Sequence, residues 1–224
     1  MKLYMHPVST TSRPVVLFAA EAGIPLDYEL VDLMVGAHLQ PDYRAINPNA
    51  LVPVLEDGDF RLTESSAILK YLADKVDSPA YPKGLRERAR VNEMMDWVNS
   101  NLYRDLAYGV AYPQMFAHHK RPSDAVHAGT IAWGLEKARG WLTTLDKALI
   151  GPNKKFLCGD TVTIADYFGA PIVTLCDLLR ADLGAYPNIR RWLSNVKALP
   201  SWPKVNEAFD GYTSAVKDQP FLTP

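Results

Sequence analysis

A change in hydrophobic pattern near residue 80 constrains the fold more than any other feature of the sequence. The first 76 residues alternate between strand-like and helix-like runs. After residue 84 the strand signals largely stop, and apolar residues recur near the 3.6-residue period of a helix. Between these regions, residues 76–84 ("VDSPAYPKG") carry two prolines and a glycine, which is typical of a linker. The pattern predicts an α/β domain at 1–76, a linker at 77–84 and an all-helical domain at 85–224.

Within the first region the predicted order is β-α-β-α-β-β-α. The runs lie at residues 2–6, 12–23, 27–33, 37–49, the two arms of a hairpin at 52–64, and 63–75. Asp57-Gly58 is expected to form a two-residue type I′ turn in that hairpin, because Asp-Gly favours this turn. A βαβ unit followed by a hairpin and a helix predicts a mixed sheet with helices packed on it.

The second region predicts a bundle of helices. Its helical runs lie at residues 85–116, 124–149, 161–181, 187–199 and 202–214. The run at 161–181 is the most apolar, so it is expected to be central. It begins with "TVTIAD", in which Thr163 is the N-cap and Asp166 occupies the third helical position, the pattern of a capping box. A capping box serves folding, so we assign it no chemistry.

Composition excludes several classes of partner. The formal net charge is −1, so no global field favours nucleic acid or an anionic membrane. No apolar run approaches the roughly 18 residues of a transmembrane helix. Pro7 and the hydroxyl residues after it interrupt the place of a signal-peptide core. The two cysteines, Cys158 and Cys176, are too few for a disulfide scaffold. We therefore expect a cytoplasmic protein with reduced thiols.

Two helix starts in the first region are candidate anion sites. One lies at Ser9–Pro14, just after the first strand, and the other at Thr63–Ser66, just after the hairpin. A helix start presents free N–H groups and the positive end of the dipole, so it binds anions. A ligand with an ionised sulfur and a carboxylate could use one start for each charge. Helix capping explains the same hydroxyl residues without a ligand, and the residues alone leave both interpretations open.

Three segments carry a recognisable pattern: "PVSTTSRPVVLFAAEAGIPLDYELVDL", "INPNALVPVLEDGDFRLTESSAILKYLADK" and "CGDTVTIADY". They resemble the cytosolic glutathione transferases, most closely theta-like members of the serine type. The resemblance extends from Lys2 to about Phe209. It implies a thioredoxin-like N-terminal domain followed by a helical C-terminal domain. It also implies glutathione as co-substrate, a small hydrophobic electrophile as second substrate, no metal, and a homodimer.

The resemblance implies roles for residues at the first helix start and on the loop after it. "SxxSR" matches Ser9 to Arg13, so Ser9 is the candidate catalytic hydroxyl, which would donate to the glutathione sulfur and favour the thiolate. Ser12 is the rival hydroxyl. "VGAHLQ" matches the segment whose histidine reaches the glycine carboxylate of glutathione, which indicates His38.

Further glutathione contacts follow from the hairpin and the helix after it. "LVPVL" matches the segment with a cis proline, so the Val52–Pro53 bond is expected to be cis and Val52 to pair its backbone with the cysteinyl part of glutathione. "TESSAI" places Glu64 on the γ-glutamyl ammonium group and Ser65 on the carboxylate beside it.

A second pocket, for the electrophile, is expected between Ser9 and the long helix at 85–116. Its candidate residues share roughly one helical face: Tyr108, Tyr112, Met115 and Phe116. His118 and His119 follow directly. Because adjacent residues of a helix point to different faces, we expect both to be solvated surface residues and expect no metal site.

Several functions remain possible on this pattern. Conjugation of glutathione to an electrophile is the leading hypothesis. Halide displacement and hydroperoxide reduction are variant reactions that the same site could catalyse. A zeta-type isomerase would carry a Ser-Cys motif, whereas Thr11-Ser12 lacks the cysteine. A thiol–disulfide oxidoreductase is disfavoured because the first domain contains no cysteine. A non-catalytic assembly module would be expected to have lost Ser9, Glu64 or Ser65, and all three are present.

Overall fold

Four strands form one mixed sheet in the first part of the chain. The computed structural model describes residues 1–224. The strands are β1 (Lys2–Met5), β2 (Asp27–Leu30), β3 (Val54–Asp57) and β4 (Phe60–Leu62), in the spatial order β2-β1-β3-β4. β1 pairs parallel with β2 and antiparallel with β3, and β3 pairs antiparallel with β4. This is the mixed sheet that the order of elements predicted, in the thioredoxin-like arrangement that the resemblance implied.

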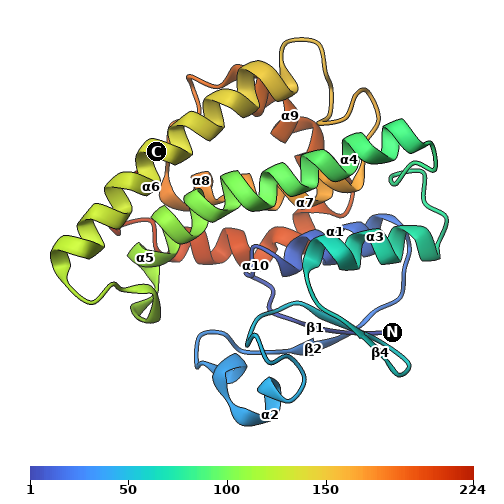
Figure 1. The fold of residues 1–224 in the computed structure, drawn as a ribbon, viewed down its shortest axis with the longest axis horizontal. Coiled ribbons are helices and arrows are strands. Elements are labelled where there is room, and N and C mark those ends of the chain that lie inside the picture. Colours follow the sequence, from blue (N-terminus) through green and yellow to red (C-terminus); the bar gives the residue numbers. More distant parts are fainter.

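Helices cover both faces of this sheet. α1 (Ser12–Glu21) and α3 (Ser65–Lys75) lie on the face toward the rest of the protein, while the short η1 (Ala37–Leu39) and α2 (Pro41–Arg44) lie on the opposite side (Figure 1). β1 shows the period-2 alternation of a strand: Leu3 and Met5 belong to the main core, and Tyr4 belongs to a small separate cluster. The sheet is thus buried on both faces near its centre.

The hairpin turn differs from its prediction. Asp57 pairs with Phe60, so the two loop residues are Gly58 and Asp59 rather than Asp57 and Gly58. Only Gly58 has a positive φ, of 64°, which fits a type II′ turn and not type I′. The predicted turn is therefore wrong by one residue. The observed register places Leu62 opposite the fully buried Leu55, and burial on that face fixes the register.

The regular elements of the second part of the chain are helices, apart from an isolated β-bridge between Phe156 and Gly159. They are α4 (Leu85–Trp97), η2 (Val98–Ala111), α5 (Tyr112–Met115), η3 (Ala117–His119), α6 (Asp124–Thr144), η4 (Leu145–Ile150), α7 (Ile164–Val173), α8 (Leu175–Leu179), α9 (Pro187–Lys197) and α10 (Trp202–Ala215). α4, η2 and α5 follow one another without a break, and η2 is π-helical over fourteen residues. None of the helices is both long enough and apolar enough to span a bilayer.

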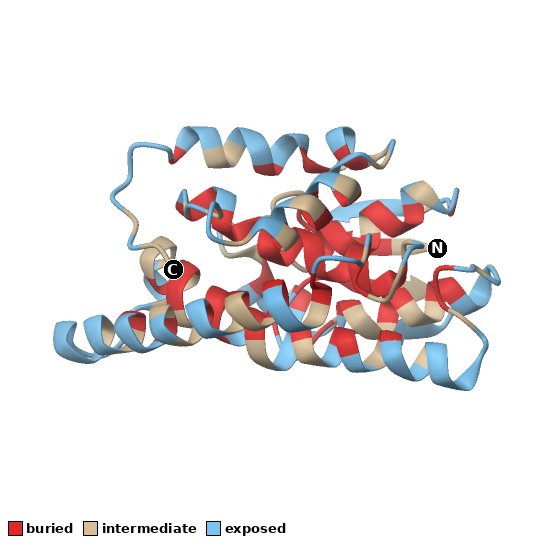
Figure 2. Cartoon of the chain, turned by 90° about the horizontal axis from the view of Figure 1, so that it is seen from above, coloured by how far each residue is buried: buried red, intermediate tan, exposed pale blue.

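α7 is the buried centre of the helical part. Every one of its residues is buried. Buried residues lie mainly in the middle of the molecule, and exposed residues lie mainly on the outer sides of the helices (Figure 2). The capping box at the start of α7 is confirmed: Thr163 and Asp166 exchange hydrogen bonds, with the Thr163 N–H 2.8 Å from Asp166 Oδ2. The helix ends at Val173, earlier than predicted, and α8 begins two residues later.

Arg13 joins the sheet domain to the helical part. Its side chain is 1% exposed and donates to the Pro171 carbonyl at 2.9 Å and to Asn206 Oδ1 at 2.8 Å. It also donates to Thr174 Oγ1 at 3.1 Å, and its guanidinium stacks 3.6 Å from the ring centre of Phe209. A single residue of α1 therefore holds α7 and α10. This role was not predicted from the "SR" of the motif.

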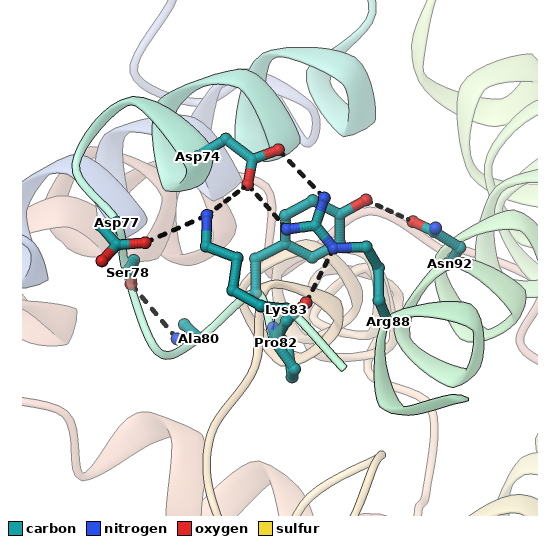
Figure 3. A network of polar contacts seen from close by, with 9 residues as sticks. Asp74, Asp77, Ser78, Ala80, Pro82, Lys83, Arg88 and Asn92 are labelled. Atoms are coloured by element: carbon teal, nitrogen blue, oxygen red, sulfur yellow. Dashed lines mark hydrogen bonds and ion pairs between the residues drawn. The ribbon is translucent and has the colours of Figure 1, made fainter. Parts of the chain in front are cut away.

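The stretch between α3 and α4 contains no regular element, yet polar contacts hold it. Asp74 pairs with Lys83 at 3.0 Å and with Arg88 at 2.7 Å, and Arg88 also donates to the Pro82 carbonyl (Figure 3). Both cations hold the pKa of Asp74 below its usual value, Arg88 more than Lys83. Because these groups are exposed, the pairs orient the segment more than they stabilise the fold.

Two glycines allow α6 and η2 to touch. A Cβ atom at Gly134 would lie 2.6 Å from the backbone carbonyl of Gly109. Replacing Gly134 with alanine is expected to lower the free energy of unfolding by about 2 kcal/mol, because overpacking of this kind costs roughly 1–3 kcal/mol. Chemical denaturation measures the change.

Gly140 is the matched control on the same helix. Nothing lies within 4 Å of a Cβ atom added there. Gly140→Ala is therefore expected to raise stability by up to about 1 kcal/mol through helix propensity. Equal effects of the two substitutions would show that the contact between the helices does not require glycine.

Candidate active site

A cavity of about 190 Å³ opens between the sheet domain and the helices. All ten predicted site residues line it. They are Ser9, His38, Val52, Pro53, Glu64 and Ser65 from the first part of the chain, and Tyr108, Tyr112, Met115 and Phe116 from the second. Residues up to 107 positions apart in the sequence thus meet at one cavity, with the polar groups on the sheet side and the aromatic groups on the helical side.

Ser9 lies just before α1, and its side chain caps the start of this helix. Its Oγ accepts hydrogen bonds from the N–H groups of Thr11 at 3.3 Å and Ser12 at 3.1 Å. Thr11 Oγ1 lies 3.3 Å from Ser9 Oγ and donates its own hydrogen to the Val52 carbonyl at 2.9 Å. Since the Thr11 hydrogen is used there, Ser9 is left as the donor in the contact between the two hydroxyls. The Ser9 hydroxyl can rotate from Thr11 Oγ1 to a ligand in the cavity.

Ser12, the rival hydroxyl, has a different position. It is 0% exposed and does not line the cavity, whereas Ser9 does. Its Oγ lies 3.5 Å from the backbone N–H of His6, at the long end of hydrogen-bond distances. Of the two serines, only Ser9 can reach a ligand without movement of the backbone.

The loop before β3 presents a backbone edge to the cavity. The Val52–Pro53 peptide bond is cis, as the resemblance implied. The preceding Leu51 carbonyl accepts hydrogen bonds from the Tyr43 hydroxyl at 2.8 Å and from Asn47 Nδ2 at 2.7 Å, which fixes the loop. The Val52 N–H donates to no other backbone group. It is thus free to pair with an extended peptide.

Glu64 and Ser65 form the start of α3. Glu64 has φ 65° and ψ 110°, in the left-handed half of conformational space, which costs about 1–3 kcal/mol for a residue other than glycine. No side chain caps the first turn of α3, so its N–H groups lack a side-chain partner. The four polar residues at 63–66 therefore do not act as surplus caps, and an anion can bind to the free N–H groups.

His38 lies on η1 and lines the cavity. It is 7% exposed, and its Nδ1 has no hydrogen-bond partner. Burial lowers the pKa of His38, and the nearby His118 acts in the same direction. Its ring lies 6.1 Å from that of His118 on the helical side.

His118 is exposed, as predicted, whereas His119 is half-buried and so differs from the prediction of a solvated surface residue. Both line the cavity, and their rings lie 4.5 Å apart on η3. The cause is Phe116, whose extended backbone (φ −118°, ψ 126°) ends the helix and directs the next residues back toward the cavity. No three His, Cys, Asp or Glu side chains of the chain are placed to hold a metal ion.

Three tyrosines form the aromatic side of the cavity. Tyr103, Tyr108 and Tyr112 meet edge to face, with ring centres 5.0–6.3 Å apart, and the hydroxyls of Tyr103 and Tyr112 lie 3.0 Å apart. Burial raises the pKa of each of the three, so they remain protonated donors. Tyr103 was not predicted. A 3.6-residue period separates it from Tyr108, whereas the i→i+5 bonding of η2 brings residues five apart together.

Comparison with known proteins agrees with this geometry. Residues 3–80 match the family model for the glutathione S-transferase N-terminal domain, and residues 116–200 match the model for the C-terminal domain. Human glutathione S-transferase theta-1 is 32% identical, over 100% of this chain and 93% of its own length.

Solved structures give the same result. The apo form of human glutathione S-transferase T1-1 superposes with a TM-score of 0.81 at 30% identity, covering 95% of this chain and 90% of that one. A delta-class glutathione transferase of Nilaparvata lugens gives a TM-score of 0.76 at 32% identity, covering 96% and 98%. The chain therefore belongs to the glutathione S-transferase family, as an enzyme of the theta-like type.

Proposed function

We propose that Ser9 activates the thiol of glutathione for nucleophilic attack on a small hydrophobic electrophile. The observation that carries this proposal is the position of the Ser9 hydroxyl at the cavity wall, directly before α1, whereas Ser12 does not line the cavity. A free thiol has a pKa near 8.5 and is mostly protonated at neutral pH. A hydrogen bond from Ser9 and the positive end of the α1 dipole both stabilise the thiolate, so both lower the thiol pKa.

The reaction then needs little more from the protein. The thiol proton leaves to solvent, the thiolate forms a bond from sulfur to the electrophilic atom, and the leaving group departs with the bonding electrons. Tyr108, Tyr112, Met115 and Phe116 supply an apolar wall against which such an electrophile can pack. Exclusion of water by this wall strengthens the interaction between Ser9 and the developing charge.

Glutathione fits the polar side of the cavity as an extended peptide. The Glu64 carboxylate would bind its ammonium group, and the free N–H groups at Ser65 would bind the adjacent carboxylate. The Val52 N–H would pair with the cysteinyl part, and His38 would bind the glycine carboxylate. Each group of the ligand thus has a partner of opposite or complementary character.

The cysteines do not support a disulfide-exchange function. Neither Cys158 nor Cys176 lines the cavity. Burial raises the pKa of Cys158 to about 11 and that of Cys176 to about 12, so both remain thiols at neutral pH. A thiol is a poor nucleophile for disulfide exchange compared with the thiolate.

A kinetic panel tests the proposal. The enzyme is assayed with glutathione and aryl halides, haloalkanes, organic hydroperoxides and an isomerase substrate, each beside Ser9→Ala. Turnover of at least one electrophile that requires glutathione and depends on Ser9 supports the proposal. Absence of glutathione binding, or full activity of Ser9→Ala on every substrate, would contradict it.

The role of Glu64 gives a separate prediction. Glu64→Gln keeps the shape of the side chain and removes the charge that faces the ammonium group. The KM for glutathione is expected to rise about tenfold while kcat stays within about twofold, because this contact is the same in ground and transition states. Glu29→Gln, on the exposed edge strand β2, is the control and should leave both constants unchanged. A loss confined to kcat would contradict this role.

We also propose that the enzyme is a homodimer, as the family resemblance implies. Sedimentation equilibrium of the full chain, with a mass of 25.0 kDa for one copy, tests this directly. A single species at the mass of one copy would contradict it.

A further inference from the structure

The charges that line the cavity are few and unevenly placed. Glu64 is the only carboxylate among the lining residues. The only lining side chains that can become cations are His38, His118 and His119. Glutathione carries one ammonium group and two carboxylates, and the free N–H groups of α3 account for one of the carboxylates. The three imidazoles are therefore the groups of the cavity best matched to the other.

The three imidazoles come from the two parts of the chain that line the cavity. His38 belongs to the sheet domain, while His118 and His119 belong to the helical part. The ring centres of His38 and His118 lie 6.1 Å apart, and those of His118 and His119 lie 4.5 Å apart. Phe116 stacks on His118 with an angle of 21° between the rings and so orients it. His38 Nδ1 is buried without a partner.

Nothing in the chain neutralises this group of imidazoles. His118 and His119 are followed in the chain by Lys120 and Arg121. Burial lowers the pKa of His119, and His118 and Arg121 act in the same direction. From η2 and α5 the imidazoles face the uncharged Tyr108 and Tyr112, which contact His119. Across the cavity Glu64 acts on Tyr108, but it perturbs neither His38 nor His119. No carboxylate of the chain is thus paired with these imidazoles, which leaves them available to an anionic group of a ligand.

We infer that His118, from the helical domain, joins His38 in binding the glycine carboxylate of glutathione, so that glutathione bridges the two domains and its binding takes up a proton. The inference rests on the proposed function. A carboxylate between two imidazoles raises the pKa of both, because each protonated ring gains an opposite charge. Binding is then strongest at low pH and weakens as pH rises through the imidazole pKa of the complex.

S-methylglutathione is the probe, because its sulfur cannot ionise and so adds no proton of its own. Isothermal titration calorimetry between pH 5.5 and 8.5, in paired buffers of different ionisation enthalpy, measures both Kd and the number of protons exchanged. The wild-type enzyme is expected to take up protons near pH 6–7, with a Kd that rises up to about tenfold per pH unit above this range for one linked proton.

Variants of His118 isolate its contribution. His118→Gln is expected to weaken binding about five- to tenfold at pH 6, as for loss of a partly exposed charge-assisted hydrogen bond, and to reduce the proton uptake. His118→Lys should restore binding and keep it constant up to pH 8. His127→Gln on α6, which does not line the cavity, is the control and should match the wild type.

A second probe tests whether the glycine carboxylate is the group that the histidines bind. In this probe the glycine carboxylate of S-methylglutathione is converted to an amide. The wild-type enzyme is expected to bind it more weakly than S-methylglutathione itself and without proton uptake. Wild type and His118→Gln should bind it with equal Kd. Unchanged proton uptake with His118→Gln, or with the amide probe, would overturn the inference while leaving the proposed function intact. Failure of S-methylglutathione to bind the wild type at any pH would instead contradict the proposed function.

Discussion

Ser9→Ala is expected to lower kcat/KM for glutathione conjugation about 10²–10³-fold, the loss that follows removal of one donor from a developing anion. The physical reason is that the thiolate loses its hydrogen bond, so the pKa of bound glutathione rises toward that of the free thiol. The remaining activity should therefore increase with pH up to about 9, whereas wild-type activity levels off at lower pH. Stopped assays across pH 6–9, with ultraviolet absorbance of the bound thiolate, measure both effects.

Two controls make this prediction specific. Ser9→Thr keeps a hydroxyl at the same position and is expected to retain much of the activity. Ser12→Ala removes the rival hydroxyl, which does not line the cavity, and should change kcat/KM little. The reverse result, with Ser12→Ala inactive and Ser9→Ala active, would assign the chemistry to Ser12.

Ser9→Ala is expected to affect the stability of the fold less than it affects catalysis. Ser9 Oγ accepts hydrogen bonds from two N–H groups at the start of α1, so Ser9→Ala should also lower the free energy of unfolding by about 1 kcal/mol. This is too small to unfold the protein, and a thermal melt separates it from the kinetic effect. Loss of activity together with a collapse in stability would not count as support for a catalytic role.

Asp166→Ala is expected to lower the free energy of unfolding by about 4 kcal/mol or more, the largest loss of stability among these predictions. Asp166 is 0% exposed and accepts from the Leu157 N–H and from Trp192 Nε1, both at 2.8 Å. It also accepts from the Thr163 N–H at 2.8 Å and from the Thr163 hydroxyl at 3.0 Å. Alanine leaves these buried donors without partners, at about 1–3 kcal/mol each before relaxation.

Chemical denaturation with matched variants tests this account. Asp160→Ala, an exposed carboxylate six residues earlier, should change stability by less than about 0.5 kcal/mol. Trp192→Phe removes one of the donors, so its effect and that of Asp166→Ala should not add, with a coupling of about 1 kcal/mol or more. Additive effects would show that the indole and the carboxylate do not stabilise one another.

Much of the fold follows from short stretches of the sequence. The alternation of strand and helix signals before residue 76, the helical period after residue 84 and the capping box at Thr163 all involve residues within about one turn or one strand of each other. Backbone geometry acts over the same distance, so these features could be predicted. The ten site residues were predicted because short motifs resemble those of the glutathione transferases, and the structure places all ten at one cavity.

Other features depend on segments that are distant in the sequence. The hairpin register follows from burial of Leu62 opposite Leu55, and the role of Arg13 follows from partners more than 150 residues away. Local pattern contains no information about either. η2, whose π-helical turn brings Tyr103 to Tyr108, likewise packs against α6, an element that follows it in the chain.

The sequence by itself determined the two-domain fold and the residues that line the polar side of the cavity. The fold follows because helix and strand periods, caps and turns are local properties of the chain, and the site residues follow from short motifs that resemble those of the glutathione transferases. Only the tertiary structure decided which serine faces the cavity and that His118 lies beside His38. Both depend on where the helical domain packs against the sheet domain, and that packing is set by burial of apolar surface across the whole chain.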